Sequence, residues 1–347
     1  MKYKISLLLF LTITLAFGQF NFTKQFNTLN AGQRLELSIP FSDHLGNTAD
    51  LPVILLEGTE EGPVFTFLAG VHGFEVSPII AVQKLVQEID LTQLKGTLIV
   101  LPISNPGSFY NRTPYKNPQD NTNLNGAFPG KKEGSITLKI AHFITTNIIP
   151  LSDVFLDIHS GDAPEDLIPF ICYYNNKRQK ENTAVAKKLS EVSGFQYIVS
   201  YPYTISDTEP AKYAFKQAVQ DGKIALSIES GKFGVVEDEA VELTRQGVLN
   251  MLNAMDMYPK NTSPHPTPIY LNHQRYTSAK MSGLFYSKHK AGDYVEKDEL
   301  IGYTTNAFGK TIEEHRAPQA GIILYMLATP AVNKGDTIAC VSAAVEE

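Results

Sequence analysis

Tryptophan is absent from the 347 residues, cysteine occurs only twice, and basic residues are not in excess, with 30 Lys and Arg against 36 Asp and Glu. The absence of tryptophan does not leave aromatic packing scarce, because 19 phenylalanines and 16 tyrosines remain. The net charge of −6 provides no concentrated basic surface for phosphate groups, which argues against nucleic acid as a partner. The sequence also lacks internal repeats and low-complexity tracts.

The two cysteines, Cys172 and Cys340, both lie in apolar stretches that are typical of strands. An oxidising compartment would permit a disulfide between them. Their strand-like settings favour instead two thiols that are buried separately.

The N-terminus carries a short apolar run, Ile5–Ala16, that follows two lysines. The run is shorter than the roughly 20 residues that are needed to span a bilayer. It is followed by Ala16-Phe17-Gly18, with small residues at the two positions that a signal peptidase reads. This pattern predicts a signal peptide at residues 1–18 and a periplasmic or secreted protein without a membrane span. An uncleaved anchor is the alternative.

Short apolar runs alternate with helical patterns through most of the chain. Strands are expected at residues 52–56, 64–69, 97–103, 153–158, 168–174, 197–200 and 223–228, and helices at 77–89, 136–149, 183–192 and 238–257. This interleaving predicts an α/β domain, with a parallel or mixed sheet that helices cover on both faces.

A proline-rich break at residues 261–268 marks the expected domain boundary. Beyond it, glycines punctuate short runs that are rich in β-branched and aromatic residues. The sequence therefore predicts an α/β domain over residues 19–260 and a smaller β-rich module over residues 261–347.

A histidine and a glutamate closely follow the apolar run at 64–69. In Ala69-Gly-Val-His-Gly-Phe-Glu, two glycines let the chain turn sharply and leave His72 and Glu75 near the carboxyl end of the expected strand. Ligand sites of open α/β sheets collect at that edge. The spacing lets an imidazole and a carboxylate bind one ion, although most such pairs taken alone are ordinary polar residues.

His159 stands at the same kind of position, just after the expected strand at 153–158. With His72 and Glu75 it completes the ligand set of a catalytic zinc, which leaves a fourth position for water. Asp157 lies two residues earlier, on the same side of an extended chain, where it could orient a ligand imidazole. Without the first motif, Asp157 and His159 would be interpreted as capping a strand.

A third motif, Ile224-Ala-Leu-Ser-Ile-Glu-Ser-Gly, ends an apolar strand with an acidic residue. A carboxylate there is costly to bury unless it has a partner or a task. Acting as general base toward the attacking water is such a task for Glu229. Capping the next turn is the alternative.

The long polar stretch 105–130 is typical of a functional or a disordered loop, and its aromatic and turn residues favour order. Arg112 could polarise the scissile carbonyl and stabilise an oxyanion. Asn125 could hydrogen-bond a substrate carboxylate. The alternative for both residues is a solvated loop surface.

Four motifs occur in order: Gly-Val-His-Gly-Phe-Glu, Asn-Arg-Thr-Pro with Asn-Leu-Asn and Phe-Pro-Gly, Asp-Ile-His-Ser-Gly, and Ile-Glu-Ser-Gly. From about Leu51 onward the chain resembles the succinylglutamate desuccinylase/aspartoacylase family of the zinc carboxypeptidase group. The resemblance implies a carboxypeptidase-like mixed sheet flanked by helices, with a β-rich C-terminal module. It also implies one zinc per chain on the three ligand candidates, Arg112 on the oxyanion side and Glu229 as the catalytic carboxylate.

One position departs from the family pattern. In the family, Asn-Leu-Asn is followed by an arginine that helps to grip a substrate carboxylate, whereas this chain has Gly126. The predicted function is that of an exported zinc-dependent amidohydrolase, a deacylase that cleaves the amide bond of a small N-acyl compound. The alternatives are a zinc carboxypeptidase that acts on short or cell-wall peptides, and a non-catalytic binding protein on the same fold.

Overall fold

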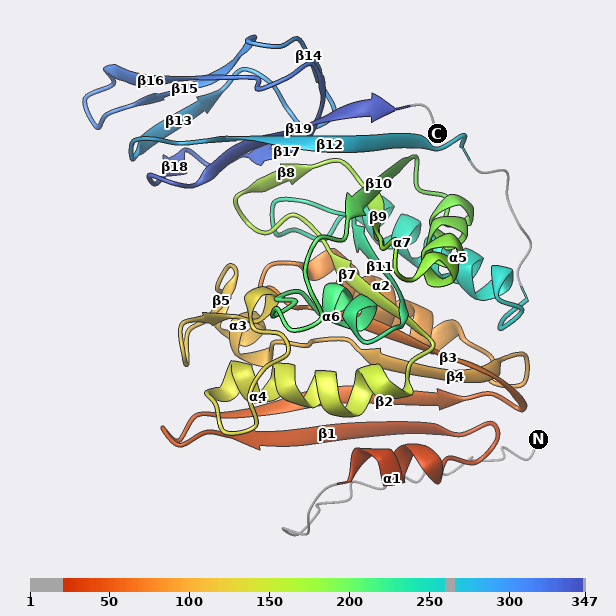
Figure 1. The fold of residues 1–347 in the computed structure, drawn as a ribbon. Helices are drawn as coiled ribbons and strands as arrows, with labels where there is room; N and C mark the ends of the chain where they lie inside the picture. Colours follow the sequence, from red (N-terminus) through yellow and green to blue (C-terminus); the bar gives the residue numbers. More distant parts are fainter. Residues whose placement is uncertain (1–20, 260–265, 346–347) are drawn as a thin grey trace, which may run out of the picture.

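The computed structural model describes residues 21–259 and 266–345, so the expected signal peptide and residues 261–265 of the proline-rich break lie outside the described residues. A 13-stranded sheet forms the centre of the fold (Figure 1). Its strands follow the order β1 (Arg34–Ser42), β2 (Thr48–Glu57), β4 (Lys95–Leu101), β3 (Glu60–Ala69), β7 (Val154–His159), β11 (Ile224–Glu229), β9 (Phe170–Asn175), β10 (Tyr197–Pro202), β12 (Ile269–Ser278), β19 (Thr337–Val345), β17 (Gly321–Leu327) and β14 (Tyr294–Val295), with β8 (Glu165–Leu167) paired to β17.

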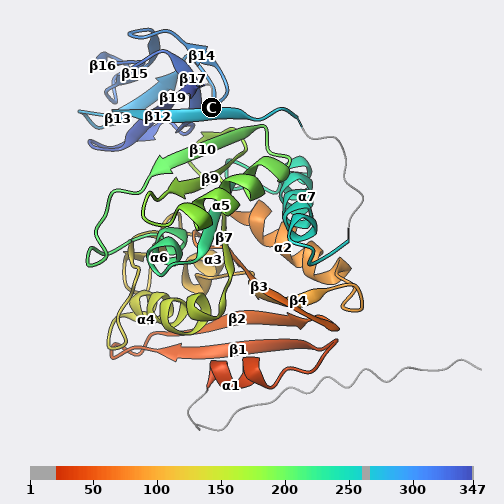
Figure 2. The ribbon, with the colours of Figure 1, turned by 45° about the vertical axis from the view of Figure 1, so that its right-hand side comes forward.

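Helices cover both faces of the α/β part of this sheet. One face carries α2 (Val76–Glu88), α5 (Lys180–Val192) and α7 (Asp238–Ala254), and the other carries α4 (Ile136–Phe143) and α6 (Ala214–Gln220). Figure 2 shows α2 and α7 on one side of the strands and α4 and α6 on the other. The two layers form two hydrophobic cores. The mixed sheet flanked by helices confirms the predicted fold class.

Among the helices of residues 21–259 and 266–345, none combines the length and the apolar character needed to cross a membrane.

Alternation along the central strand β7 puts its polar side chains on one face. Leu156 and Ile158 pack in the core beneath α2, α5 and α7, whereas Phe155 packs in the core beneath α4 and α6. Because successive side chains of a strand point to opposite faces, Asp157 and His159 share the face of Phe155. The polar end of β7 is therefore directed toward the α4/α6 layer.

The C-terminal module is built of strands, as predicted. Its second sheet contains β16 (Thr311–Arg316), β15 (Leu300–Thr305), β13 (Gly283–Ser287) and β18 (Ala331–Val332). The module also continues the main sheet, because β12 pairs in parallel with β10 and β19 pairs with β12. The sequence did not predict this continuity, because the pairing joins segments on the two sides of the proline-rich break.

The polar stretch 105–130 is ordered and contains short elements. They are α3 (Pro106–Asn111), β5 (Lys116–Asn117), β6 (Thr122–Asn123) and the 3-10 turn η1 (Leu124–Gly126). Asn105 caps α3 by accepting a hydrogen bond from the Ser108 backbone N–H at 3.2 Å. A proline at the first helical position fits this start, since its nitrogen has no hydrogen to leave unpaired.

Several other elements differ from the sequence predictions. The N-terminal helix α1 (Phe22–Asn27), strand β1 and helix α6 were not predicted. The helix expected at 136–149 begins at Ile136 but changes to a π-helical segment, η2 (Ile144–Ile148), and then to a 3-10 turn, η3 (Ile149–Leu151). Pro150 lies in this last turn, where a proline cannot continue the α-helical hydrogen bonds.

Candidate metal and catalytic site

Three parallel strands bring the predicted metal ligands to one edge of the sheet. β3, β7 and β11 are neighbours and run parallel, so their carboxyl ends meet. His72 follows β3, His159 is the last residue of β7, and Glu75 precedes α2. Glu75 occupies the N-cap position of α2, yet its side chain makes no capping hydrogen bond, which leaves its carboxylate available to the histidines.

The three side chains form a compact, buried cluster. One ligand atom from each of His72, Glu75 and His159 lies within 4.8 Å of the others. Glu75 Oε1 lies 2.7 Å from His72 Nδ1, and Glu75 Oε2 lies 3.0 Å from His159 Nδ1. The Nδ1 atoms of both imidazoles are thus directed at the Glu75 carboxylate.

The opposite ring nitrogens face oxygen acceptors. Asn123 Oδ1 lies 3.1 Å from His72 Nε2, and Asp157 Oδ1 lies 3.0 Å from His159 Nε2. Asp157 is fully buried and also accepts a 3.4 Å hydrogen bond from the Phe215 backbone N–H through Oδ2. With a metal ion bound at the Nδ1 atoms, these oxygens would hold the proton of each imidazole at Nε2.

The cluster fits a catalytic zinc. Two imidazole nitrogens and one carboxylate are the donor set that catalytic zinc sites use. Oxygen acceptors behind the imidazoles, which orient the rings, are also typical of such sites. Burial by itself would raise the pKa of Glu75, but His159 and His72 outweigh that effect and lower the pKa to about 2. Glu75 is therefore an anion at neutral pH, as a metal ligand must be.

Glu229 lies directly beside the metal cluster. It is the last residue of β11 and stands opposite His159 in the parallel pairing with β7. Ala225 of the same strand packs in the α4/α6 core, so alternation directs Glu229 to the face that also carries His159. The residue keeps some exposure, but its carboxyl group is enclosed. Burial and the neighbouring Glu75 raise its pKa well above the usual value, against an opposing effect of His159.

A cavity of about 280 Å³ joins three of the predicted site residues, Asn125, His159 and Glu229. Its other walls carry mainly aromatic side chains from β9, β10, β12 and α6. Cys172 also lines this cavity, and both cysteines are buried and unbridged, which confirms the prediction of separate thiols.

Arg112 stands apart from the residues that line this cavity. It is exposed and ends α3 in the left-handed conformation, with φ of 53°. The turn that carries it is packed against the metal-binding loop, because a Cβ on Gly73 would collide with the carbonyl oxygens of Ser108 and Thr113. The structure therefore puts the arginine next to the site without directing it into the cavity.

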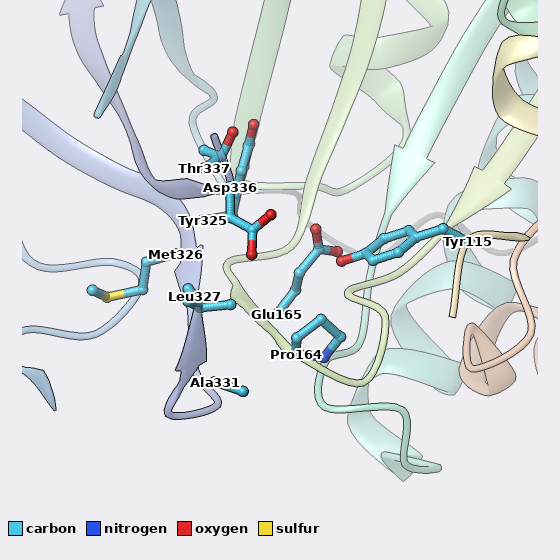
Figure 3. A pocket seen from close by; sticks show the side chains of 9 residues that line it. All are labelled: Tyr115, Pro164, Glu165, Tyr325, Met326, Leu327, Ala331, Asp336 and Thr337. Carbon is cyan, nitrogen blue, oxygen red and sulfur yellow. The ribbon is translucent and has the colours of Figure 1, made fainter. Parts of the chain in front are cut away.

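Sequence reasoning missed a group of residues on the other side of His72. The Tyr115 ring meets His72 edge to face, with ring centroids 5.5 Å apart, and its backbone N–H donates to Asp162 Oδ2 at 3.0 Å. Figure 3 shows the Tyr115 hydroxyl pointing to Glu165 in a second cavity of about 360 Å³, next to the C-terminal module. Burial and the charge of Glu75 raise the pKa of Asp162 to about 6. In the sequence, this group was indicated only by the acidic residues Asp162 and Glu165, which closely follow His159.

Comparison with known proteins identifies the family. The family model described as the succinylglutamate desuccinylase/aspartoacylase catalytic domain matches residues 61–255. The chain belongs to this family. Among its relatives, the N-alpha-acetyl-L-2,4-diaminobutyric acid deacetylase of Halomonas elongata is 31% identical over 324 residues, which cover 90% of this chain and 91% of the relative.

Solved structures of the family share the fold. The product-bound ectoine utilization protein EutE (DoeB) from Ruegeria pomeroyi matches 91% of this chain and 98% of its own, with a TM-score of 0.80 and 22% identity. A succinylglutamate desuccinylase/aspartoacylase from Rhodobacter sphaeroides matches 90% and 96%, with a TM-score of 0.79 and 22% identity. A desuccinylase and a deacetylase both remove an acyl group from nitrogen, so family membership makes this chain a deacylase, a hydrolase of amide bonds.

Proposed function

We propose that this chain is an exported zinc-dependent deacylase that hydrolyses the amide bond of a small N-acyl amino acid. The observation that carries the proposal is the buried triad of His72, Glu75 and His159, with Glu229 paired opposite His159 on a shared cavity. A binding protein has no need for a ligand set and an adjacent enclosed carboxyl group together.

The chemistry divides between the metal and the protein. A zinc ion on the three ligands would supply Lewis-acid polarisation of the carbonyl and lower the pKa of water. Glu229 accepts a proton from the attacking water and delivers it to the amide nitrogen as the carbon–nitrogen bond breaks. The direction of its pKa shift, upward through burial, makes Glu229 a stronger proton acceptor than an exposed carboxylate.

The remaining residues orient these groups. Asp157 and Asn123 hold the imidazoles of His159 and His72 with Nδ1 directed at the ligand position. Asn125 lines the cavity, where its amide can donate to a substrate carboxylate. We assign Arg112 the oxyanion role that the family pattern implies; this role requires its exposed side chain to turn inward on substrate binding.

Metal removal tests the proposal. The purified protein should contain about one zinc per chain and hydrolyse members of a panel of N-acetyl and N-succinyl amino acids. Dialysis against a chelator should remove both the zinc and the hydrolysis, and added zinc should restore them. Hydrolysis that continues in protein shown by elemental analysis to be metal-free would contradict the proposal, as would a zinc-loaded protein that hydrolyses none of the panel.

The export part of the proposal rests on the sequence of residues 1–18 alone. Mass spectrometry of protein from the native host should find an N-terminus near Gln19. Soluble cytoplasmic protein that retains Met1 would contradict export and leave the proposed reaction untouched.

A further inference from the structure

Aromatic side chains form most of the wall of the cavity that contains Glu229. Six rings line it, from Phe170, Tyr174, Tyr201, Tyr213, Phe215 and Tyr276. Their elements are β9, β10, the start of α6 and β12, so the α/β domain and the C-terminal module both contribute. At about 280 Å³ the cavity is slightly smaller than a pocket for a drug-sized ligand, and it suits one side chain of a substrate.

The rings differ in how firmly they are held. Tyr174 stacks on Phe215 with centroids 4.7 Å apart and an angle of 21°, and both are buried. Tyr213 and Tyr276 keep 39% and 52% of their surface exposed, although they line the same cavity. Packing therefore holds the buried pair in place, whereas the two tyrosines keep part of their surface in contact with solvent.

The charges around the cavity disfavour an acidic side chain. Among the described residues that line it, Lys and Arg are absent and Glu229 is the acidic one. A side-chain carboxylate among the rings, in addition to the α-carboxylate at Asn125, would find no Lys or Arg on the cavity wall to pair with, which is costly.

A cationic side chain is disfavoured for a different reason. One of the six rings already has a cation, because Lys216 Nζ lies 5.3 Å from the Tyr174 centroid. This contact uses the attraction of that ring for positive charge. A further cation inside the cavity would also pair with Glu229, whose carboxylate must stay free to accept a proton.

Asn125 indicates which half of the substrate enters. It is the candidate for binding the substrate carboxylate and lines the same cavity as the rings. We propose that the cavity binds the uncharged aromatic side chain of the amino-acid half, so that N-acylated aromatic amino acids are the substrate class. The proposal rests on the deacylase function proposed above. Aromatic rings pack edge to face or offset with rings of this kind, beyond the gain from burial alone.

A matched series of substrates tests the proposal. N-acetyl derivatives of phenylalanine, alanine, aspartate and 2,4-diaminobutyrate share the same amide bond and α-carboxylate and differ in the side chain. We expect kcat/KM for acetyl-phenylalanine to exceed that for acetyl-alanine by roughly ten- to hundredfold, the scale of burying one phenylalanine side chain. The acidic and cationic derivatives should be poorer still. Equal or better turnover of any of the other three would overturn the proposal.

Variants of the exposed ring locate the effect. Tyr276→Ala should raise KM for acetyl-phenylalanine about tenfold, leave kcat nearly unchanged and hardly affect acetyl-alanine. Tyr276→Phe keeps the ring and should retain the preference. Tyr294→Ala removes another exposed tyrosine of the same module, 61% exposed, and serves as the matched control. An equal loss for all substrates in Tyr276→Ala would also overturn the proposal.

Calorimetry separates this inference from the proposed reaction. Binding of the four compounds to zinc-loaded Glu229→Gln protein measures preference without turnover. Preferred binding of acetyl-phenylalanine, together with an inactive wild type, would retain the pocket and contradict the deacylase. Zinc-dependent hydrolysis without an aromatic preference in rate or binding would retain the deacylase and contradict the pocket.

Discussion

The metal cluster and the polar stretch 105–130 are in contact but are built in different ways. His72, Glu75 and His159 are buried at the ends of central strands or beside a helix start, and each is held by its neighbours. Arg112 and Gly126 are exposed on the stretch 105–130, whose helix and turns are all short. The sheet thus fixes the reacting groups, whereas exposed positions of the stretch 105–130 that contact none of the ligands can vary without disturbing them.

Gly126 illustrates this freedom. A Cβ built at this position would meet no atom within 4 Å, so nothing in the packing requires a glycine. Gly73, four residues after the end of β3, has no such freedom, because the carbonyl oxygens of Ser108 and Thr113 occupy the space. A substitution at position 126 can therefore change substrate preference without changing the packing around the metal ligands.

Removal of a metal ligand should have the largest effect on zinc content and hydrolysis. His159→Ala removes one of three ligands, so the protein should lose most of its zinc, and hydrolysis should fall to the level of the metal-free protein. Elemental analysis and a rate assay measure both, and circular dichroism should show an intact fold. His44→Ala, which changes an exposed histidine, is the control and should keep its zinc. Full zinc occupancy in His159→Ala would remove His159 from the ligand set.

Glu229→Gln separates chemistry from metal binding. The change keeps size and hydrogen bonding but removes the base, so kcat should fall by roughly two to four orders of magnitude. Zinc content should be unchanged, because Glu229 is no ligand in the proposed site. Glu181→Gln, on the exposed first turn of α5, should have no effect. Near-normal turnover in Glu229→Gln would mean that another group accepts the proton.

Gly126→Arg tests the contribution of the stretch 105–130 to recognition of a substrate carboxylate. An arginine restores the family's carboxylate-gripping residue, and the space around Gly126 allows it. Preference for acyl-amino acids over their uncharged amides should rise by about 1.5–3 kcal/mol, the scale of a hydrogen bond to a charged group. Gly126→Gln supplies length without charge and should show little of this gain. If the wild type already prefers the free acids strongly, a cationic side chain from another part of the protein already binds the substrate carboxylate.

The outer acceptors should have the smallest effect on the metal side. Asp157→Asn and Asn123→Ala leave the three ligands in place but weaken the hold on the imidazole tautomers. Each should reduce zinc affinity or activity by about 10- to 100-fold, measured by competition with a chelator of known affinity. If zinc affinity and rate stay at wild-type values in both variants, the two oxygens do not orient the histidines.

The sequence predicted the central elements best. The runs 64–69, 153–158 and 223–228 correspond to β3, β7 and β11, because their largely apolar character is what burial on both faces requires. It did not predict β1, α3 or α6. β1 is stabilised by its pairing with β2 along nine residues, and α3 by a cap and packing inside a polar stretch, so neither gave a strong local signal.

By itself, the sequence determined which residues end the central strands, and with them the set of His72, Glu75, His159 and Glu229. Local periodicity is enough for this, because a strand and its last side chain are defined by neighbouring residues. Only the tertiary structure decided that Glu229 pairs opposite His159, that Asn123 meets His72, and that Tyr276 reaches the same cavity as Glu229. Those contacts join segments far apart in the chain. Their partners are selected by the packing of the whole sheet and its helices, which no local pattern contains.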